Sequence, residues 1–229
     1  MSQNWAGSIV QTPSDTNLSS VTGTFIVPDP KLPAGATSAR EWRGAAWVGI
    51  DGFTPDEGGL LQAGVVWEVV NTVKNGTSTV ETSFEAVYEW LPATSAKLGN
   101  VKITAGDVIT VSCQAADSFH GSCSIENHST GVSAKEEMVA PTTGAGLNGH
   151  HAEWIVEDFY TGHGNVPLAN FGTVEWYGCA AAARPVAPST SPQIICAGEG
   201  MNMIMADQKQ NPLTTVSISG ENMAVTYIQ

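Results

Sequence analysis

Four stretches of the chain alternate with a period of two between strongly apolar residues and smaller or polar ones. This alternation is typical of β-strands whose two faces meet different surroundings. The stretches cover residues 46–52, 60–68, 84–90 and 151–159. Between the second and the third lies Asn75-Gly76, a dipeptide that strongly favours a tight hairpin turn. The pattern therefore predicts four strands, two of which form a hairpin.

The second face of each stretch carries a few polar side chains set among apolar ones. Ordinary solvent-exposed faces are richer in Thr, Lys and Ser, so this face is predicted to line a groove. Four unrelated, half-exposed strands would produce the same pattern, because the order of strands in a sheet cannot be read from the sequence. The predicted groove residues are Trp47, Asp51, Gln62, Glu89, Glu153 and Glu157.

The composition indicates an all-β fold. Val and Thr occur 22 times each and Leu only 9 times, and 24 Gly and 12 Pro are spread along the chain. Enrichment in β-branched residues with regular turn residues favours a sandwich or a barrel. The sequence contains no internal repeat and no low-complexity linker, so we expect residues 1–229 to form a single domain.

The charge balance excludes several partners. Lys and Arg number 9 against 22 Asp and Glu, which gives a formal net charge of -13 and a pI of about 4.6. Nucleic acids and anionic membranes require a basic surface, so neither is an expected partner. No apolar run reaches the ~20 residues of a membrane span. A chain with few bases also builds up little positive self-repulsion in acid, although acidic sequences are often simply soluble.

Four cysteines indicate an oxidising compartment, and we expect the protein to be secreted. Sequential pairing, Cys113 with Cys123 and Cys179 with Cys196, closes two short loops and demands least of the fold, although four cysteines allow three connectivities. No CxxC motif is present, which disfavours a zinc ribbon or a redox dithiol. Three N-x-[ST] sequons, at Asn17, Asn75 and Asn127, are compatible with secretion. No signal peptide precedes the first motif, so Met1-Ser2-Gln3 is interpreted as a trimmed or artificial start.

The common catalytic signatures are absent: the sequence has no G-x-S-x-G, HExxH, P-loop or Asp-Thr/Ser-Gly motif. His150 and His151 are adjacent, so in a strand they face opposite ways. His151 and Glu153 could offer two metal ligands on one face, but we predict no metal and no cofactor, and we interpret the histidines as polar surface side chains. Carboxyl groups and amides remain as catalysts. They would serve acyl transfer to water, a glycoside hydrolase with two carboxyl groups, or a carbohydrate-binding groove.

Five short motifs follow one another in the first two thirds of the chain. They are Asn4-Trp5-Ala6-Gly7, Trp47-Val48-Gly49-Ile50-Asp51-Gly52, Leu61-Gln62-Ala63-Gly64, Tyr88-Glu89-Trp90 and Ala152-Glu153-Trp154-Ile155-Val156-Glu157-Asp158-Phe159. Each motif alone is weak, but five in order are specific. The sequence resembles the glutamic peptidases, or eqolisins, in which these motifs occur in the same order.

The resemblance implies a concanavalin-like sandwich of two antiparallel sheets and an acid endopeptidase that acts on polypeptides. It places the catalytic pair at Gln62, as oxyanion donor, and Glu153, as general base and then acid on a bound water. It also implies roles in substrate binding or around the pair for Trp5, Trp47, Asp51, Glu89 and Glu157. We expect a monomer.

The chain departs from the family pattern at two positions of the predicted groove. Leu91 stands where the family has an aromatic residue, and Val66 replaces an acidic one. The segments 91–100 and 141–150 also diverge. These differences concern the choice of substrate rather than the catalytic pair.

Overall fold

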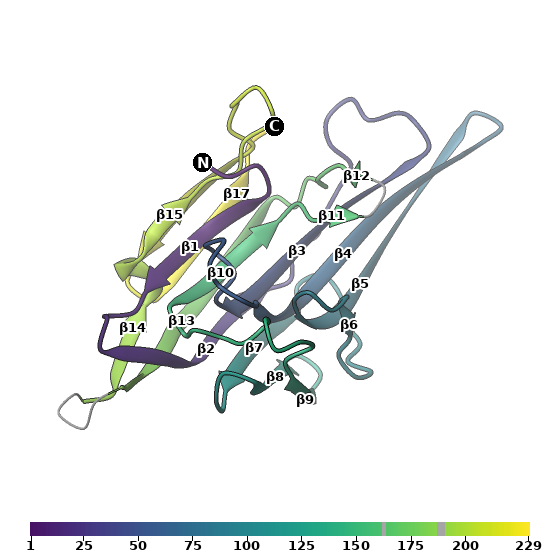
Figure 1. Cartoon of the computed structure of the whole chain (residues 1–229). Coiled ribbons are helices and arrows are strands. Elements are labelled where there is room, and N and C mark those ends of the chain that lie inside the picture. Colours follow the sequence, from purple (N-terminus) through teal and green to yellow (C-terminus); the bar gives the residue numbers. More distant parts are fainter. Residues whose placement is uncertain (162–163, 187–190) are drawn as a thin grey trace.

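In a computed structural model, which describes residues 1–161, 164–186 and 191–229, two antiparallel sheets pack face to face (Figure 1). We call the first the cleft sheet; its strand order is β15-β1-β10-β3-β4-β5-β6. The second, the back sheet, has the order β16-β17-β13-β2-β7-β8-β9, and β14 pairs with β13. The predicted fold class, an all-β sandwich of two antiparallel sheets, is confirmed.

The connections between the strands range from two-residue turns to the thirteen residues 27–39. A single 3-10 turn, Ala197–Glu199, is the helical element among the described residues, and no helix there is long and apolar enough to span a membrane. The strands are β1 (Trp5–Gln11), β2 (Thr16–Ile26), β3 (Arg40–Ile50), β4 (Leu61–Lys74), β5 (Thr77–Trp90), β6 (Ala96–Lys97), β7 (Val108–Ala115), β8 (His120–Asn127), β9 (Val132–Val139), β10 (His151–Glu157), β11 (Tyr160–Thr161), β12 (Gly164–Asn165), β13 (Thr173–Pro185), β14 (Gln193–Cys196), β15 (Met201–Met203), β16 (Thr214–Ser219) and β17 (Asn222–Tyr227).

The core lies between the sheets and is built from the apolar face of each strand. Trp67, Trp154 and Trp176 are completely buried there. The indole of Trp154 crosses the layer, and its Nε1 donates to the carbonyl of Thr22 at 2.7 Å. Gly23 makes this approach possible, because a Cβ at that position would lie 2.8 Å from Trp154 Cδ1. Large aromatic side chains from both sheets therefore interlock at the centre of the sandwich.

All four predicted strands are present. The first ends at Ile50, and the last ends at Glu157, so Asp51 and Asp158 lie just outside them. The hairpin prediction is also confirmed, since Lys74 pairs with Thr77 around Asn75 and Gly76. Both turn residues have positive φ, at 50° and 78°, as a two-residue hairpin turn requires.

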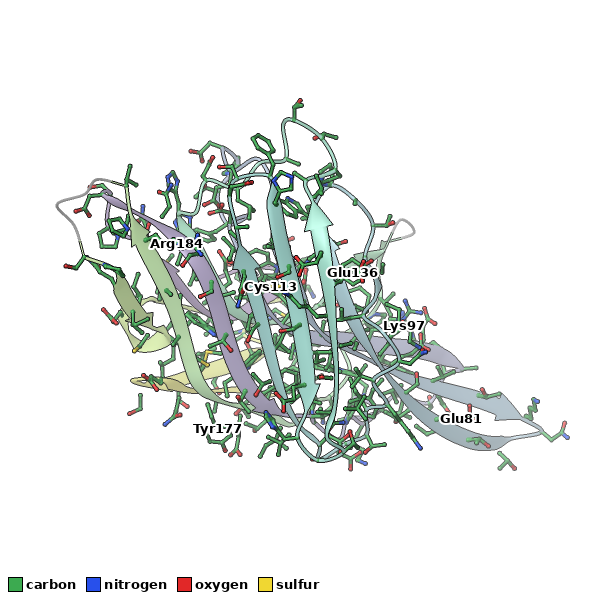
Figure 2. All side chains as sticks on the ribbon, turned by 90° about the horizontal axis from the view of Figure 1, so that it is seen from below. Glu81, Lys97, Cys113, Glu136, Tyr177 and Arg184 are labelled. Atoms are coloured by element: carbon green, nitrogen blue, oxygen red, sulfur yellow. A yellow bond between two sulfur atoms is a disulfide. The ribbon has the colours of Figure 1, made fainter. Side chains whose placement is uncertain are left out.

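The β4–β5 hairpin continues well beyond the body of the sandwich as an uncovered two-stranded ribbon. Figure 2 shows it extending past the back sheet, with Glu81 near its end. The side chains of its outer half, residues 72–83, are exposed on both faces. Only the inner half of the hairpin contributes to the core and to the cleft.

One of the two predicted disulfides is present. Cys113 and Cys123 are direct partners of β7 and β8, and they are bonded. Cys179 and Cys196 are free, so their predicted pairing is wrong. The register explains why: Ala180, not Cys179, is the partner of Cys196, so the two side chains point to opposite sides of the sheet. Cys179 is buried, whereas Cys196 Sγ faces Glu221.

Candidate active site

A single row of register partners crosses the concave face of the cleft sheet. Glu153 on β10 pairs with Gly49 on β3, Gly49 pairs with Gln62 on β4, and Gln62 pairs with Glu89 on β5. Adjacent strands lie ~4.8 Å apart, so the backbones of Glu153 and Gln62 are separated by about 10 Å. Since residues directly opposite one another share a face, the assignment of Glu153, Gln62 and Glu89 to one face of the sheet is confirmed.

Gly49 lies between the two predicted catalytic residues, and its lack of a side chain makes room for the groups packed above it. A Cβ at this position would lie 2.8 Å from Trp47 Cζ3, 2.9 Å from Leu60 Cδ1 and 3.2 Å from Glu153 Oε2. The carboxyl group of Glu153 and the side chains of Trp47 and Leu60 therefore all lie close to the Cα of Gly49.

Replacing this glycine provides a test of the geometry. We expect Gly49→Ala to lower kcat/KM for a peptide substrate by about 10²-fold, because the methyl group displaces the reacting groups by about an ångström. The enzyme should still fold, since two of the three contacts are with ends of movable side chains. Gly144→Ala is the matched control, because its Cβ would meet nothing nearer than 3.9 Å. Equal activities of the two variants would contradict this description of the site.

Glu153 is fully buried, and neither of its carboxyl oxygens has a hydrogen-bond partner among the described residues. Burial raises the pKa of Glu153 well above its ordinary value, and the charges of Asp51 and Glu57 raise it further. A carboxyl group with these surroundings is protonated over a wider pH range than an exposed one. In the same environment its ionised form is a stronger base than a free carboxylate.

Gln62 is held by its neighbour in the row. Its Nε2 donates to Glu89 Oε2 at 2.6 Å, while its Oε1 is buried and accepts no hydrogen bond from the described residues. Burial raises the pKa of Glu89 even though the amide of Gln62 donates to it. An amide nitrogen carries two hydrogens, so one of them remains available after the bond to Glu89 is made.

Glu157 lies on the same face of β10 as Glu153, nearer the N-terminal motif. Its carboxylate accepts from Trp47 Nε1 at 2.7 Å and from Asn4 Nδ2 at 3.3 Å. Burial raises the pKa of Glu157, against the effect of the Trp47 bond. Trp5 packs edge-on against Trp47, with ring centroids 5.0 Å apart. The N-terminal segment is thus joined to the wall of the groove through Asn4 and Trp5.

A cavity of about 390 Å³ opens beside Gln62. It is lined by four of the predicted site residues besides Gln62 (Trp5, Trp47, Glu89 and Glu157) and by apolar side chains that include Leu60, Leu91 and Phe159. Glu153 is not in contact with this cavity, since it lies on the far side of Gly49. Leu60, Asn4 and Phe159 were not predicted as site residues. Phe159 and Leu60 were nevertheless on the groove face assigned from the alternation.

Asp51 is placed differently from the prediction. It follows β3 in a left-handed conformation, with φ of 65°, and its carboxylate points away from the cavity. The oxygens accept backbone N–H groups of Asn148, Gly149 and His150 at 2.7 Å and of His151 at 3.2 Å. Burial raises the pKa of Asp51, and these bonds lower it. Asp51 therefore organises the loop that leads into β10, and it affects Glu153 through its charge.

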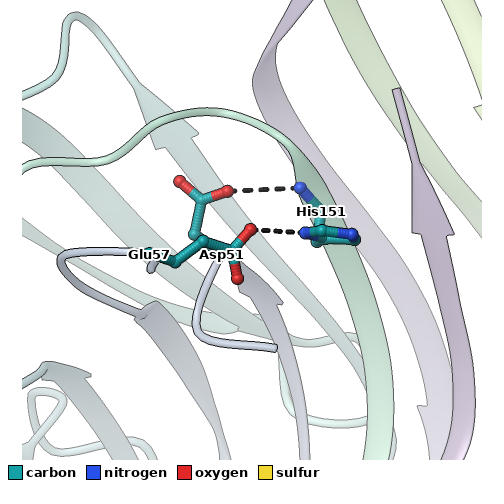
Figure 3. Close-up of side chains that lie close together, drawn as sticks. All are labelled: Asp51, Glu57 and His151. Carbon is teal, nitrogen blue, oxygen red and sulfur yellow. Dashed lines mark hydrogen bonds and ion pairs between the residues drawn. The ribbon is translucent and has the colours of Figure 1, made fainter. Parts of the chain in front are cut away.

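The interpretation of His151 as a polar surface residue is wrong. His151 is buried, and its Nδ1 bonds to Glu57 Oε1 next to Asp51, as Figure 3 shows. The three side chains bring candidate ligand atoms within 4.8 Å of one another, a spacing that a metal ion could bridge. Their hydrogen bonds argue against it, because the Asp51 oxygens already accept four backbone N–H groups and Glu57 also accepts Thr54 N–H at 2.9 Å. The cluster suits a structural or electrostatic role better than metal binding.

An antiparallel sandwich whose concave sheet holds a side-chain amide and a buried, high-pKa carboxyl group in one row has the architecture of a glutamic peptidase. The sequence matches the Peptidase A4 family over residues 3–227. The chain belongs to this family, that of the glutamic peptidases or eqolisins, and is a glutamic endopeptidase.

The relatives agree in sequence and in structure. The chain is 32% identical to aspergillopepsin-2 of Aspergillus niger over 243 residues, which span 99% of this chain and 78% of that protein. A crystal structure of scytalido-glutamic peptidase with a peptide-based transition-state analogue superposes with a TM-score of 0.76 at 28% identity, covering 99% of this chain and 98% of the other. A structure of SCP-B, an eqolisin in complex with the tripeptide Ala-Ile-His, gives 0.72 at 27% identity with the same coverage.

Proposed function

We propose that this chain hydrolyses peptide bonds in acid, with Gln62 and Glu153 as its catalytic residues. One observation carries the proposal: Gln62 and Glu153 lie on either side of Gly49 in the register, and three of their buried acceptor atoms, Gln62 Oε1 and both oxygens of Glu153, have no donor among the described residues. A water molecule has two O–H groups, and it can satisfy acceptors on both side chains at once. Its lone pair is then free to attack a carbonyl carbon.

The reaction follows from these positions. Ionised Glu153 takes a proton from the water, whose oxygen forms a bond to the scissile carbonyl carbon. The second Nε2 hydrogen of Gln62 donates to the oxyanion while the first stays on Glu89. When the C–N bond breaks, Glu153 returns its proton to the leaving amine. The step needs no covalent intermediate, because water itself is the nucleophile.

The surroundings support this division of roles. Glu153 has to be ionised for the first step and protonated for the last; a raised pKa makes the ionised form a stronger base in the first step and keeps the proton on the carboxyl group until the leaving amine accepts it. Gln62 cannot ionise, so it can donate to an oxyanion at any pH. Trp5, Trp47, Glu89 and Glu157 line the adjoining cavity, and we assign them to substrate binding or to holding the catalytic pair.

The substrate class is a polypeptide, by analogy with the tripeptide and the peptide-based transition-state analogue bound in the related structures. An extracellular location is consistent with the Cys113–Cys123 disulfide. We propose that the chain acts as a monomer and that residues 1–229 form one domain. Leu91, which lines the cavity where the family has an aromatic residue, is the first candidate for a difference in substrate choice.

The experiment is digestion of a denatured protein between about pH 2 and pH 7 by the wild type and by Gln62→Ala. We expect the wild type to cleave in acid, and neither pepstatin nor a chelator to prevent it. Gln62→Ala should lose about 10²–10³-fold in kcat, the usual value of an oxyanion donor. Cleavage is followed by mass spectrometry, and folding by circular dichroism.

Two other functions would give different results. A glycoside hydrolase would depend on two carboxyl groups and tolerate Gln62→Ala. A carbohydrate-binding sandwich would bind glycans and cleave no peptide. Full activity of a folded Gln62→Ala variant would overturn the assignment of Gln62, and a folded wild type without peptidase activity would overturn the proposal as a whole.

A further inference from the structure

The proposed reaction makes no use of the buried pair formed by Glu57 and His151. The carboxylate of Glu57 is completely buried, and the His151 side chain is 9% exposed. Glu57 lies in the loop after β3, where it also accepts Thr54 N–H. His151 is the first residue of β10, and Phe53 packs edge-on against its ring at 5.3 Å. The pair therefore joins the loop after β3 to the start of the strand that carries Glu153.

The charges of the Glu57–His151 pair affect the pKa of Glu153. His151 lies two residues before Glu153 on the same face of β10, and both Glu57 and Asp51 raise the pKa of Glu153 by their negative charge. Burial works to raise the pKa of Glu57, but the bonds from His151 and Thr54 outweigh it, so Glu57 stays ionised further into acid than an ordinary glutamate. The imidazolium form of His151 opposes the charge of the two carboxylates.

We propose that Glu57 and His151 form a positioning pair for Glu153, which fixes the loop after β3 against β10 and balances the carboxylate charge beside the catalytic residue. This inference rests on the proposed function of Glu153. His151 and Glu57 touch neither the cavity nor the reacting atoms, so they act through Glu153.

Four other titratable groups of the described residues lie near His151. Asp51 faces it from the end of β3, Asp56 lies on the same loop as Glu57, and His150 and Glu153 are its neighbours on and before β10. Asp56 is exposed, so its charge is screened by solvent. Asp51 is present in every variant described below, and the charge of Glu57 raises the pKa of Asp51 as well.

The test compares Glu57→Gln with His151→Gln, because glutamine keeps a hydrogen bond in the pair and removes one charge. We measure kcat/KM against pH and follow its acid limb, where ionisation of the general base controls the rate. Glu57→Gln removes a negative charge, so the limb should move to lower pH by about one unit. His151→Gln removes a positive charge, so the limb should move to higher pH by about one unit. In the double variant the limb should return close to its wild-type position.

A surface pair offers a matched control. His128 Nδ1 lies 3.4 Å from Glu126 Oε1 with both side chains exposed, so Glu126→Gln and His128→Gln should leave the limb unchanged. If the pair has only a mechanical role, Glu57→Gln and His151→Gln should both lose activity, and the acid limb should not move in opposite directions. That result would overturn the inference. Thermal unfolding shows whether a variant is poorly folded. In that case the pKa of Glu153 is measured by ¹³C NMR on the single variant that does fold, and its shift from the wild-type value tests the inference.

The inference and the proposed function can fail separately. If Gln62 and Glu153 prove dispensable, the proposed function fails. If both are essential but the acid limb and the Glu153 titration do not respond in opposite directions to the two charge changes, only the role of Glu57 and His151 is wrong.

Discussion

Glu153→Gln should abolish peptide cleavage, with a loss of about 10⁴-fold or more in kcat, because a single residue acts as both base and acid in the proposed reaction. The replacement is close in shape, and it removes a carboxyl group that is completely buried. The fold should therefore survive, and at neutral pH the variant should be more stable than the wild type. Initial rates on a fluorogenic peptide and thermal unfolding of the same sample measure both effects.

Glu85→Gln is a suitable control for that measurement. Glu85 is on β5 of the same sheet, separated from β10 by β3 and β4, and it is exposed and paired with Lys97 at 3.5 Å. Its replacement should change kcat less than about twofold, as exposed ion pairs contribute little. Substantial cleavage by a folded Glu153→Gln variant would remove Glu153 from the reaction.

The second large effect concerns stability: the protein should be most stable in acid and should lose stability as the pH rises from about 4 to 8. Five carboxyl groups of the cleft sheet and its adjoining loops have raised pKa values, and burial is the first cause in each case. They are Asp51, Glu89, Glu153, Glu157 and Asp158. For Asp158, which also feels the charge of Glu157, the pKa is raised to about 7.

The direction follows from proton linkage. A carboxyl group whose pKa is higher in the folded protein holds its proton there after the unfolded chain has lost it. Its contribution to stability is complete below the ordinary pKa and disappears as the pH rises through the folded value. For Asp158 that window runs from 3.8 to about 7. Each pKa unit corresponds to about 1.4 kcal/mol, so several such groups should lower the melting temperature by roughly 10 °C over this range.

Differential scanning calorimetry at a series of pH values measures this change. The net charge of -13 at neutral pH also destabilises the fold, but about 0.5 M salt screens surface repulsion far more than it affects buried groups. Asp158→Asn should flatten the fall in melting temperature between pH 4 and 8. A melting temperature that rises across this range would show that ionisation of these carboxyl groups does not lower the stability of the folded protein.

The alternation of side chains predicted the wall of the site well. Trp47, Gln62, Glu89, Glu153 and Glu157 do lie on one concave face, because the period of a strand assigns faces without knowledge of its neighbours. The same assignment could not show that Gly49 separates Gln62 from Glu153, since strand order and register depend on pairing between distant segments. It also placed His151 on the correct face, although not in the correct environment.

Residues outside the strands were the least predictable. Asp51 and Glu57 stand in an irregular segment, so the alternation extended to Asp51 gave the wrong direction for its carboxylate, and no alternation covers Glu57. Their partners, the backbone N–H groups of 148–151 and the ring of His151, are almost one hundred residues away in the sequence. The failed prediction for Cys179 and Cys196 has a similar cause, because a register shifted by one residue reverses a side chain.

The uncovered end of the β4–β5 hairpin has a consequence for the lifetime of the enzyme. An endopeptidase encounters other copies of itself. Its cleft binds an extended chain, so a segment can be cleaved only after its backbone has separated from the neighbouring strands. Strands inside the sandwich are paired on both sides, whereas the ribbon around Asn75 and Gly76 has only one pairing and no core to hold it. Self-digestion is therefore expected to begin at this ribbon. A cut there leaves the row from Glu153 to Glu89 intact, because those residues belong to the inner half of the sheet.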